Sequence, residues 1–158
     1  MTNGHPKGLY VLFYTEMWER FSYYGMRAIL VLYMTKALMF DMARASTIYG
    51  NFTGLAYLMP LAGGYISDRW WGNRRSVLVG GLIMAAGQFI MFLSASHWDN
   101  PALSHPLLWG GLGVLIAGTG LFKANISSMV GSLYAPGDAK KDSAFTIFYM
   151  GVNIGAFL

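Results

Sequence analysis

The chain has 158 residues, of which 55% are hydrophobic, 16% are aromatic and only 11% are charged. This composition is more apolar than that of an average soluble domain, and it predicts an all-α membrane protein. The absence of cysteine excludes a disulfide framework and any zinc site built on thiolates. The formal net charge of +4 does not indicate nucleic-acid binding, because the Lys and Arg residues are scattered between apolar runs.

The apolar runs predict four membrane spans and the beginning of a fifth, since about 20 helical residues cross ~30 Å of hydrocarbon. In chain order, we expect helices at residues 10–38, 48–66, 77–95, 107–133 and 143–158. Together they form one incomplete bundle over residues 1–158, with about four and a half transmembrane helices. The last run is still apolar where the sequence stops, so we expect this to be the N-terminal part of a longer protein.

The positive charges predict the orientation of these spans, because Lys and Arg favour cytoplasmic loops. One side carries six of them, Lys7, Arg69, Arg74, Arg75, Lys140 and Lys141. The other side carries two, Lys36 and Arg44. We therefore expect the N-terminus in the cytoplasm and the segment 96–106 outside. The histidines, His5, His97 and His105, lie in the N-terminal tail or in this external segment, where we expect them to be solvated.

The first expected helix carries charged residues within its apolar sequence. At about 100° per residue, five side chains share one side of the helix, which we call the charged face: Glu16, Glu19, Arg20, Tyr23 and Arg27. Tyr24 borders this face. Four unpaired charges in the middle of a bilayer would cost on the order of 10 kcal/mol, so the charged face must contact protein or water.

Two interpretations of the charged face are open. Glu16 and Arg20 could neutralise each other while Glu19 and Arg27 extend to the interface. Alternatively, the face lines an aqueous path for ions or substrate. Lys123, the single charge in the fourth expected helix, favours the second interpretation because it needs an anion, although it could also serve only to hold the bundle together.

A carboxylate beside a cation in a water-filled cavity can act as a proton switch. The cation keeps the carboxylate ionised, whereas protonation breaks the pair and releases the cation for another anion. A ligand carboxylate could then bind Arg20 or Lys123, which would couple proton entry to ligand binding. Additional hydrogen bonds and ring contacts would come from Tyr23, Tyr24, Tyr57 and Asn153.

Three stretches of the sequence resemble the proton-coupled oligopeptide transporters, a branch of the major facilitator superfamily. EMWERFSYYG, residues 16–25, is similar to the ExxERFxYYG motif of this family. FTIFYMGVNIGAF, residues 145–157, is similar to its helix 5 signature, and GGYISDRWWGNRR, residues 63–75, to the superfamily's loop between helices 2 and 3. Two differences stand out: Ala124 follows Lys123 where many relatives have proline, and Gly50 stands near the position where animal members have a histidine.

The resemblance implies the N-terminal part of a major facilitator superfamily bundle that carries out proton-coupled symport of di- and tripeptides by alternating access. It implies a bacterial cytoplasmic (inner) membrane, with the lipid bilayer and a C-terminal half of the same chain as partners. No cofactor is expected besides the proton as coupling ion, and we expect neither a metal site nor enzymatic activity. Relatives in plants carry nitrate and other anions, so a carrier of another small anion remains an alternative, as does a membrane scaffold that transports nothing.

The resemblance also implies roles for particular residues. Proton coupling would involve Glu16, Glu19, Arg20 and Lys123. The peptide would be bound by Arg20, Tyr23, Tyr24, Arg27, Tyr57, Lys123 and Asn153. Asp68 and Arg69 would belong to a gate on the cytoplasmic side, or would make only a surface contact.

Overall fold

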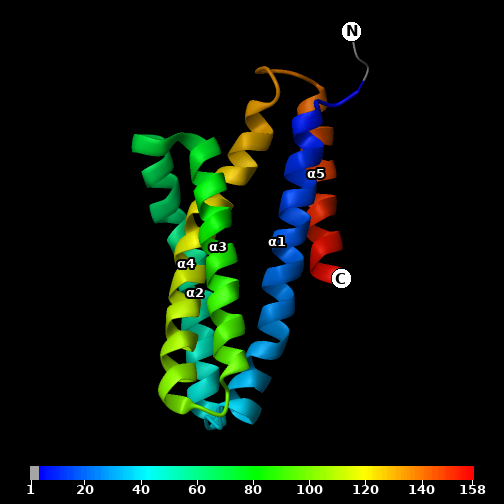
Figure 1. Cartoon of the computed structure of the whole chain (residues 1–158). Coiled ribbons are helices and arrows are strands. Elements are labelled where there is room, and N and C mark those ends of the chain that lie inside the picture. Colours follow the sequence, from blue (N-terminus) through cyan, green and yellow to red (C-terminus); the bar gives the residue numbers. More distant parts are fainter. Residues whose placement is uncertain (1–3) are drawn as a thin grey trace. The chain divides into compact units, whose positions relative to one another are not determined.

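The computed structural model describes residues 4–158, and in this part of the chain all regular secondary structure is helical. α1 runs Lys7–Leu32 and continues into a π-helical turn, η1, at Tyr33–Ala37. α2 runs Met42–Ile66, a second π-helical turn, η2, follows at Ser67–Trp71, and α3 runs Gly72–Ser96. α4 runs Pro101–Ser132 and α5 runs Lys140–Phe157 (Figure 1). The all-α fold class expected from composition is confirmed.

All five α-helices of the described residues begin before the apolar windows that predicted them, because helices continue past the hydrocarbon into the interface. α2 starts at Met42 rather than near residue 48, and its N-cap is Asp41, whose carboxylate accepts a hydrogen bond from the backbone N–H of Arg44 at 2.9 Å. Pro101 occupies the first turn of α4, where a missing N–H has no consequence. α2 continues as helix through Pro60.

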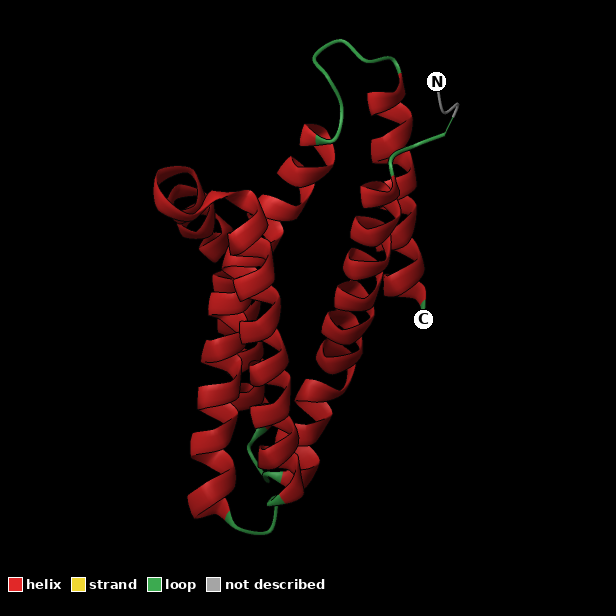
Figure 2. Ribbon diagram, turned by 45° about the horizontal axis from the view of Figure 1, so that its top comes forward, coloured by secondary structure: helices red, strands yellow, loops and turns green. Residues whose placement is uncertain are grey.

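The connection between α2 and α3 is compact. The two helices and η2 form one continuous helical stretch, Met42–Ser96, which changes direction at Gly72. Gly72 has a φ of 72°, a left-handed conformation that glycine adopts without the steric penalty of a side chain. The connection expected at residues 67–76, between the predicted second and third helices, is therefore a π-helical turn followed by a change of direction at one glycine, and Figure 2 shows helix across this region.

Two stretches are long and apolar enough to cross a membrane by length and composition alone: Met42–Ser96, with 55 residues, and Pro101–Ser132. Neither α1 nor α5 meets this test among the described residues. α1 carries the charged face, and the 18 residues of α5 include three charged side chains, Lys140, Lys141 and Asp142.

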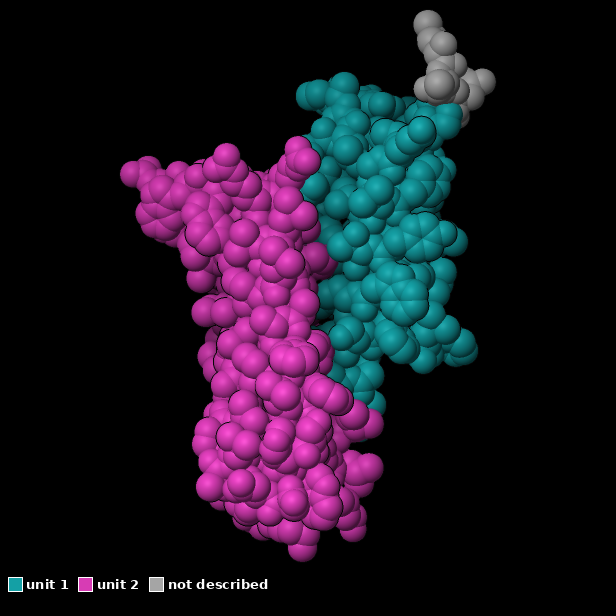
Figure 3. Space-filling model, in the orientation of Figure 1, with its two compact units in different colours: residues 1–28, 126–158 teal, residues 29–125 magenta. Residues whose placement is uncertain are grey.

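The chain divides into two compact units, which Figure 3 shows in different colours. Unit 1 contains residues 1–28 and 126–158, and unit 2 contains residues 29–125. In unit 1, α5 lies alongside α1 (Figures 1 and 2) because two glycines of α5 allow backbone contact. A Cβ at Gly151 would lie 2.9 Å from the carbonyl oxygen of Phe13, and one at Gly155 would overlap the carbonyl oxygen of Met17.

Unit 2 is held together by close contacts between α2, α3 and α4. Gly63 of α2 faces the backbone of Gly120 in α4, and a Cβ at Gly80 of α3 would lie 2.9 Å from the carbonyl oxygen of Gly118. Such contacts between small residues allow helices to approach closely in lipid. Gly50 and Gly54, also small residues four apart, have open space where a Cβ would be.

Candidate functional site

The carboxylates of the charged face share one arginine in unit 1. Nε of Arg20 donates a hydrogen bond to Oε1 of Glu16 at 2.7 Å, and Nη2 of Arg20 lies 2.6 Å from the same oxygen. Nε of Arg20 also lies 3.5 Å from Oε2 of Glu19. We call these three residues the carboxylate cluster. The helix geometry explains it, since positions three and four residues apart are neighbours on one face of α1.

The carboxylate cluster is buried although it carries three charges. The side chain of Glu16 is 1% exposed, that of Glu19 is 6% exposed and that of Arg20 is 16% exposed. A buried ion pair of this kind is held by electrostatic attraction, and removing one partner leaves an uncompensated charge. The cluster is therefore sensitive to the protonation of either carboxylate.

One turn further along α1, two tyrosines and an arginine follow the carboxylate cluster. The guanidinium of Arg27 lies over two rings, with its Cζ 5.4 Å from the centroid of Tyr23 and 5.7 Å from that of Tyr24. The two tyrosine rings meet edge to face, with centroids 5.6 Å apart. Cation–π contact with two rings fixes the orientation of the guanidinium.

Glycines of α5 pack beside the carboxylate cluster within unit 1. The Cβ of Arg20 lies 3.0 Å from the position that a Cβ at Gly155 would occupy, next to the contact with Met17. The segment GVNIG, residues 151–155, is thus the part of α5 that supports the charged face. Asn153, between the two glycines, is exposed.

In unit 2, Lys123 of α4 contacts an aromatic ring of α2. Its Nζ lies 5.1 Å from the ring centroid of Tyr57, whose side chain is otherwise largely exposed. Two residues further along α4, Asn125 is buried, and its Nδ2 donates hydrogen bonds to the carbonyl oxygens of Leu121 at 2.7 Å and Gly63 at 3.4 Å. Asn125 thereby ties the Lys123 segment to α2, a role that its sequence context did not reveal.

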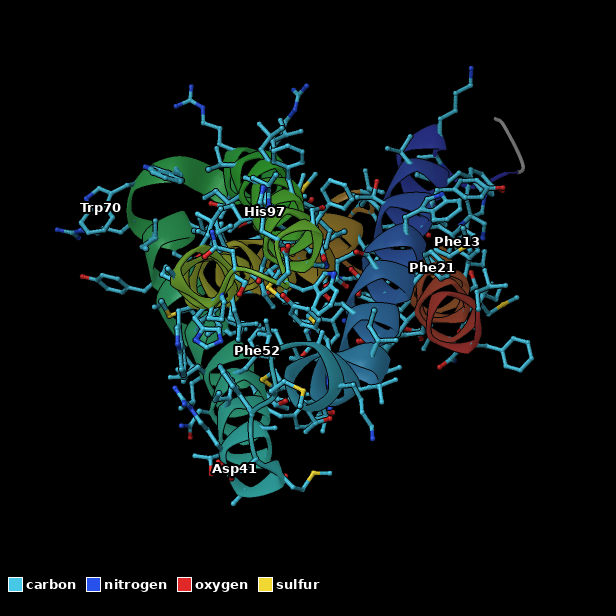
Figure 4. All side chains as sticks on the ribbon, turned by 60° about the horizontal axis from the view of Figure 1, so that its bottom comes forward. Phe13, Phe21, Asp41, Phe52, Trp70 and His97 are labelled. Atoms are coloured by element: carbon cyan, nitrogen blue, oxygen red, sulfur yellow. The ribbon has the colours of Figure 1, made fainter. Side chains whose placement is uncertain are left out.

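Asp68 and Arg69 lie in η2 and are both exposed. Neither forms a salt bridge with another residue of the described chain. The turn is braced instead by Ser67, whose hydroxyl donates to Oδ1 of Asn73 at 2.9 Å. Figure 4 shows the neighbouring Trp70 pointing away from the ribbon, consistent with an aromatic side chain at a membrane interface.

The histidines differ in their surroundings. His5, expected to be solvated, is partly buried: its Nδ1 lies 2.8 Å from the hydroxyl of Tyr134 and its Nε2 lies 3.5 Å from Oγ of Ser143. Burial and the negative charge of Asp138 raise the pKa of Tyr134. His105 packs against the ring of Phe40, whereas His97 is exposed.

These features define a multi-pass, α-helical membrane protein with a buried ionisable cluster in its first helix. The sequence assigns it further: residues 74–158 match the model of the POT family, and the chain belongs to this family. This confirms the resemblance seen in the three sequence motifs.

Individual relatives agree with this assignment. The chain is 45% identical to the "Peptide transporter YePEPT" of Yersinia enterocolitica, over 98% of this chain and 30% of that protein. It is 38% identical to the "Dipeptide and tripeptide permease B" of Photorhabdus asymbiotica, over 96% of this chain and 29% of that protein. Among solved structures, a mutant of peptide transporter POT in complex with alafosfalin superimposes with a TM-score of 0.89 at 44% identity, over 99% of this chain and 32% of that one. The chain thus spans about 30% of the length of the curated relatives it matches.

Proposed function

We propose that the protein containing this chain is a proton-coupled symporter of di- and tripeptides. Membership of the POT family and similarity to a peptide transporter and a dipeptide and tripeptide permease support the substrate class. The observation that supports proton coupling most directly is the shared arginine of the carboxylate cluster, in which Arg20 contacts both Glu16 and Glu19.

The chemistry of the carboxylate cluster suits proton coupling. While both carboxylates are ionised, they compete for one guanidinium, and adding a proton to either one weakens its hold on Arg20. The released guanidinium can then bind the carboxylate of a peptide by charge-assisted hydrogen bonds. Proton binding and peptide binding would therefore favour each other, as symport requires.

The remaining site residues have roles in binding. In this proposal, Arg27 and Lys123 also attract the peptide carboxylate, and Lys123 responds to protonation with the carboxylate cluster. Tyr23, Tyr24, Tyr57 and Asn153 contact peptide side chains and backbone, because phenol and amide groups offer both polar and apolar contact. Asp68 and Arg69 belong to a gate that opens and closes on the cytoplasmic side.

We place the protein in the cytoplasmic membrane of a bacterium, with the N-terminus inside. The six basic residues of the cytoplasmic loops against two outside support this orientation. The protein would work by alternating access, with the N-terminal helices rocking against a C-terminal half that lies outside this chain.

The proposal is tested with the full-length protein in sealed proteoliposomes. Uptake of a labelled dipeptide should follow an imposed pH gradient, since each pH unit supplies about 1.36 kcal/mol per proton. Unlabelled di- and tripeptides should compete, whereas nitrate should not. Equal uptake after the gradient is collapsed with a protonophore, or competition by nitrate alone, would contradict the proposal.

A further inference from the structure

Unit 2 contains a groove that the proposed transport mechanism does not use. Its volume is about 450 Å³. One side is formed by the end of α1 and by η1, and the other side by the end of α3 and the residues that follow it. Ile29, Leu32, Ala37 and Ala95 make it largely apolar. Lys36 and Trp98 provide its two polar groups besides the hydroxyl of Tyr33.

The floor of the groove is fixed by hydrogen bonds that need no ligand. The hydroxyl of Tyr33 lies 2.7 Å from Oγ of Ser94, and the Ser94 hydroxyl donates to the carbonyl oxygen of Ser104 at 2.8 Å. In η1 the wide π-helical turn is closed by the backbone N–H of Leu38, which donates to the carbonyl oxygen of Tyr33 at 3.2 Å. These contacts hold the walls of the groove in place, and π-helical turns frequently occur at functional sites.

The groove lies at the level of the lipid headgroups. α3 has 25 residues and is about 37 Å long at ~1.5 Å per residue, which exceeds the ~30 Å hydrocarbon core. Trp71 precedes α3 and Trp98 follows it, and both indole rings are exposed, as in the aromatic belts at the two surfaces of a membrane. The end of α3 next to Trp98 is therefore at the interface. Ile29 lies about two helical turns before Lys36 in the sequence, which places it deeper in the hydrocarbon.

Within residues 4–158, Lys36 is a cation without an acidic partner. It forms no salt bridge with any carboxylate in the part of the chain that the structure describes, and no acidic side chain lines the groove. Ile29 and Leu32 remain 61% and 57% exposed, so the groove joins one positive charge to an apolar channel. This combination is complementary to a phosphate group that is attached to an acyl chain.

We propose that this groove binds one anionic phospholipid. Lys36 pairs with the phosphodiester, the indole N–H of Trp98 donates to the glycerol ester region, and an acyl chain lies along Leu32 and Ile29. A lipid such as phosphatidylglycerol is favoured over phosphatidylethanolamine, because the headgroup ammonium of the latter competes with Lys36 for the same phosphate. None of the residues proposed to bind the peptide lines this groove.

The test is native mass spectrometry of the purified full-length protein, titrated with phosphatidylglycerol or phosphatidylethanolamine. We expect the wild type to retain one phosphatidylglycerol in preference to phosphatidylethanolamine. Lys36→Gln should weaken this first binding event at least five-fold, while Lys36→Arg should preserve it. Size-exclusion chromatography of each variant verifies that the fold is kept.

Arg44→Gln is the matched control, since Arg44 is expected on the same side of the membrane as Lys36 but does not line the groove. Its Cζ lies 4.3 Å from the ring centroid of Phe40. It should leave the first lipid in place. Unchanged lipid binding by Lys36→Gln, or an equal loss in Arg44→Gln, would overturn the proposal. Displacement of the lipid by millimolar inorganic phosphate would also overturn it, because the site would then recognise a free anion.

Discussion

Arg20 contacts Glu16 through two nitrogens that converge on a single oxygen, Oε1, at 2.7 Å from Nε and 2.6 Å from Nη2. The second oxygen of this carboxylate, Oε2, is buried and has no hydrogen-bond partner among the described residues. A carboxylate held at one oxygen only can accept a proton at the other without first losing the guanidinium. This asymmetry gives the carboxylate cluster a defined place for a proton to enter.

If the charged face lines a water-filled path, cysteines on this face should react with water-soluble thiol reagents. Residues 1–158 contain no native cysteine, so a single substitution introduces the only thiol in this part of the protein, and any cysteine outside it is first replaced by serine. In the full-length protein, we expect labelling of Tyr23→Cys and Arg20→Cys by a charged methanethiosulfonate.

Trp18→Cys provides the matched control, because Trp18 is on the opposite side of α1 and 58% exposed, where lipid would cover it. His97→Cys, in the exposed segment after α3, verifies that the reagent is active. Labelling of position 18 with none at 20 or 23 would show that the charged face is not in water.

Gly155→Ala should destabilise the packing of α5 against α1. A Cβ there would overlap the carbonyl oxygen of Met17, and relief requires the two helices to separate. Overpacking of this kind costs about 1–3 kcal/mol, so we expect a drop of several degrees in the melting temperature of the purified full-length protein.

Gly113→Ala is the control for this substitution, since a Cβ at Gly113 has open space around it and alanine favours a helix over glycine. Its melting temperature should be unchanged or slightly higher. Equal melting temperatures for Gly155→Ala and wild type would contradict the close helix contact.

The residues that make up the charged face could be predicted from the sequence because the periodicity of an α-helix is fixed. Residues 16, 19, 20, 23 and 27 fall on one side of any α-helix, and α1 is continuous across them. The apolar windows likewise indicated where helices occur, since burial in hydrocarbon determines composition directly.

Details that depend on contacts between distant residues could not be predicted. Gly151 and Gly155 look like ordinary small residues, and only the backbone of Phe13 and Met17 explains why a side chain is excluded. His5 was expected to be solvated because it lies in the N-terminal tail, but it contacts Tyr134, which is 129 positions away in the sequence. The π-helical turns at 33–37 and 67–71 have no local sequence signal comparable to a proline or a capping residue.

The ring of Tyr57, rather than its hydroxyl, should matter for Lys123. Nζ lies 5.1 Å from the ring centroid, and a cation–π contact at an exposed site is worth about 0.5–1 kcal/mol. Tyr57→Leu should therefore raise the KM for dipeptide about two- to five-fold, whereas Tyr57→Phe should leave it near the wild-type value. An equal rise in KM for the two substitutions in initial-rate uptake assays would show that the hydroxyl, not the ring, is used, and an unchanged KM for both would contradict the contact.

The carboxylate cluster is tested most directly by comparing two modes of transport in Glu19→Gln. Counterflow exchanges labelled for unlabelled peptide without net proton movement, whereas uptake driven by a pH gradient requires the proton site. In full-length protein reconstituted into proteoliposomes, Glu19→Gln should retain counterflow and lose gradient-driven uptake, while Asp99→Asn, in the exposed segment after α3, should retain both. Gradient-driven uptake by Glu19→Gln at the wild-type rate would contradict the proposed role of this carboxylate in proton coupling.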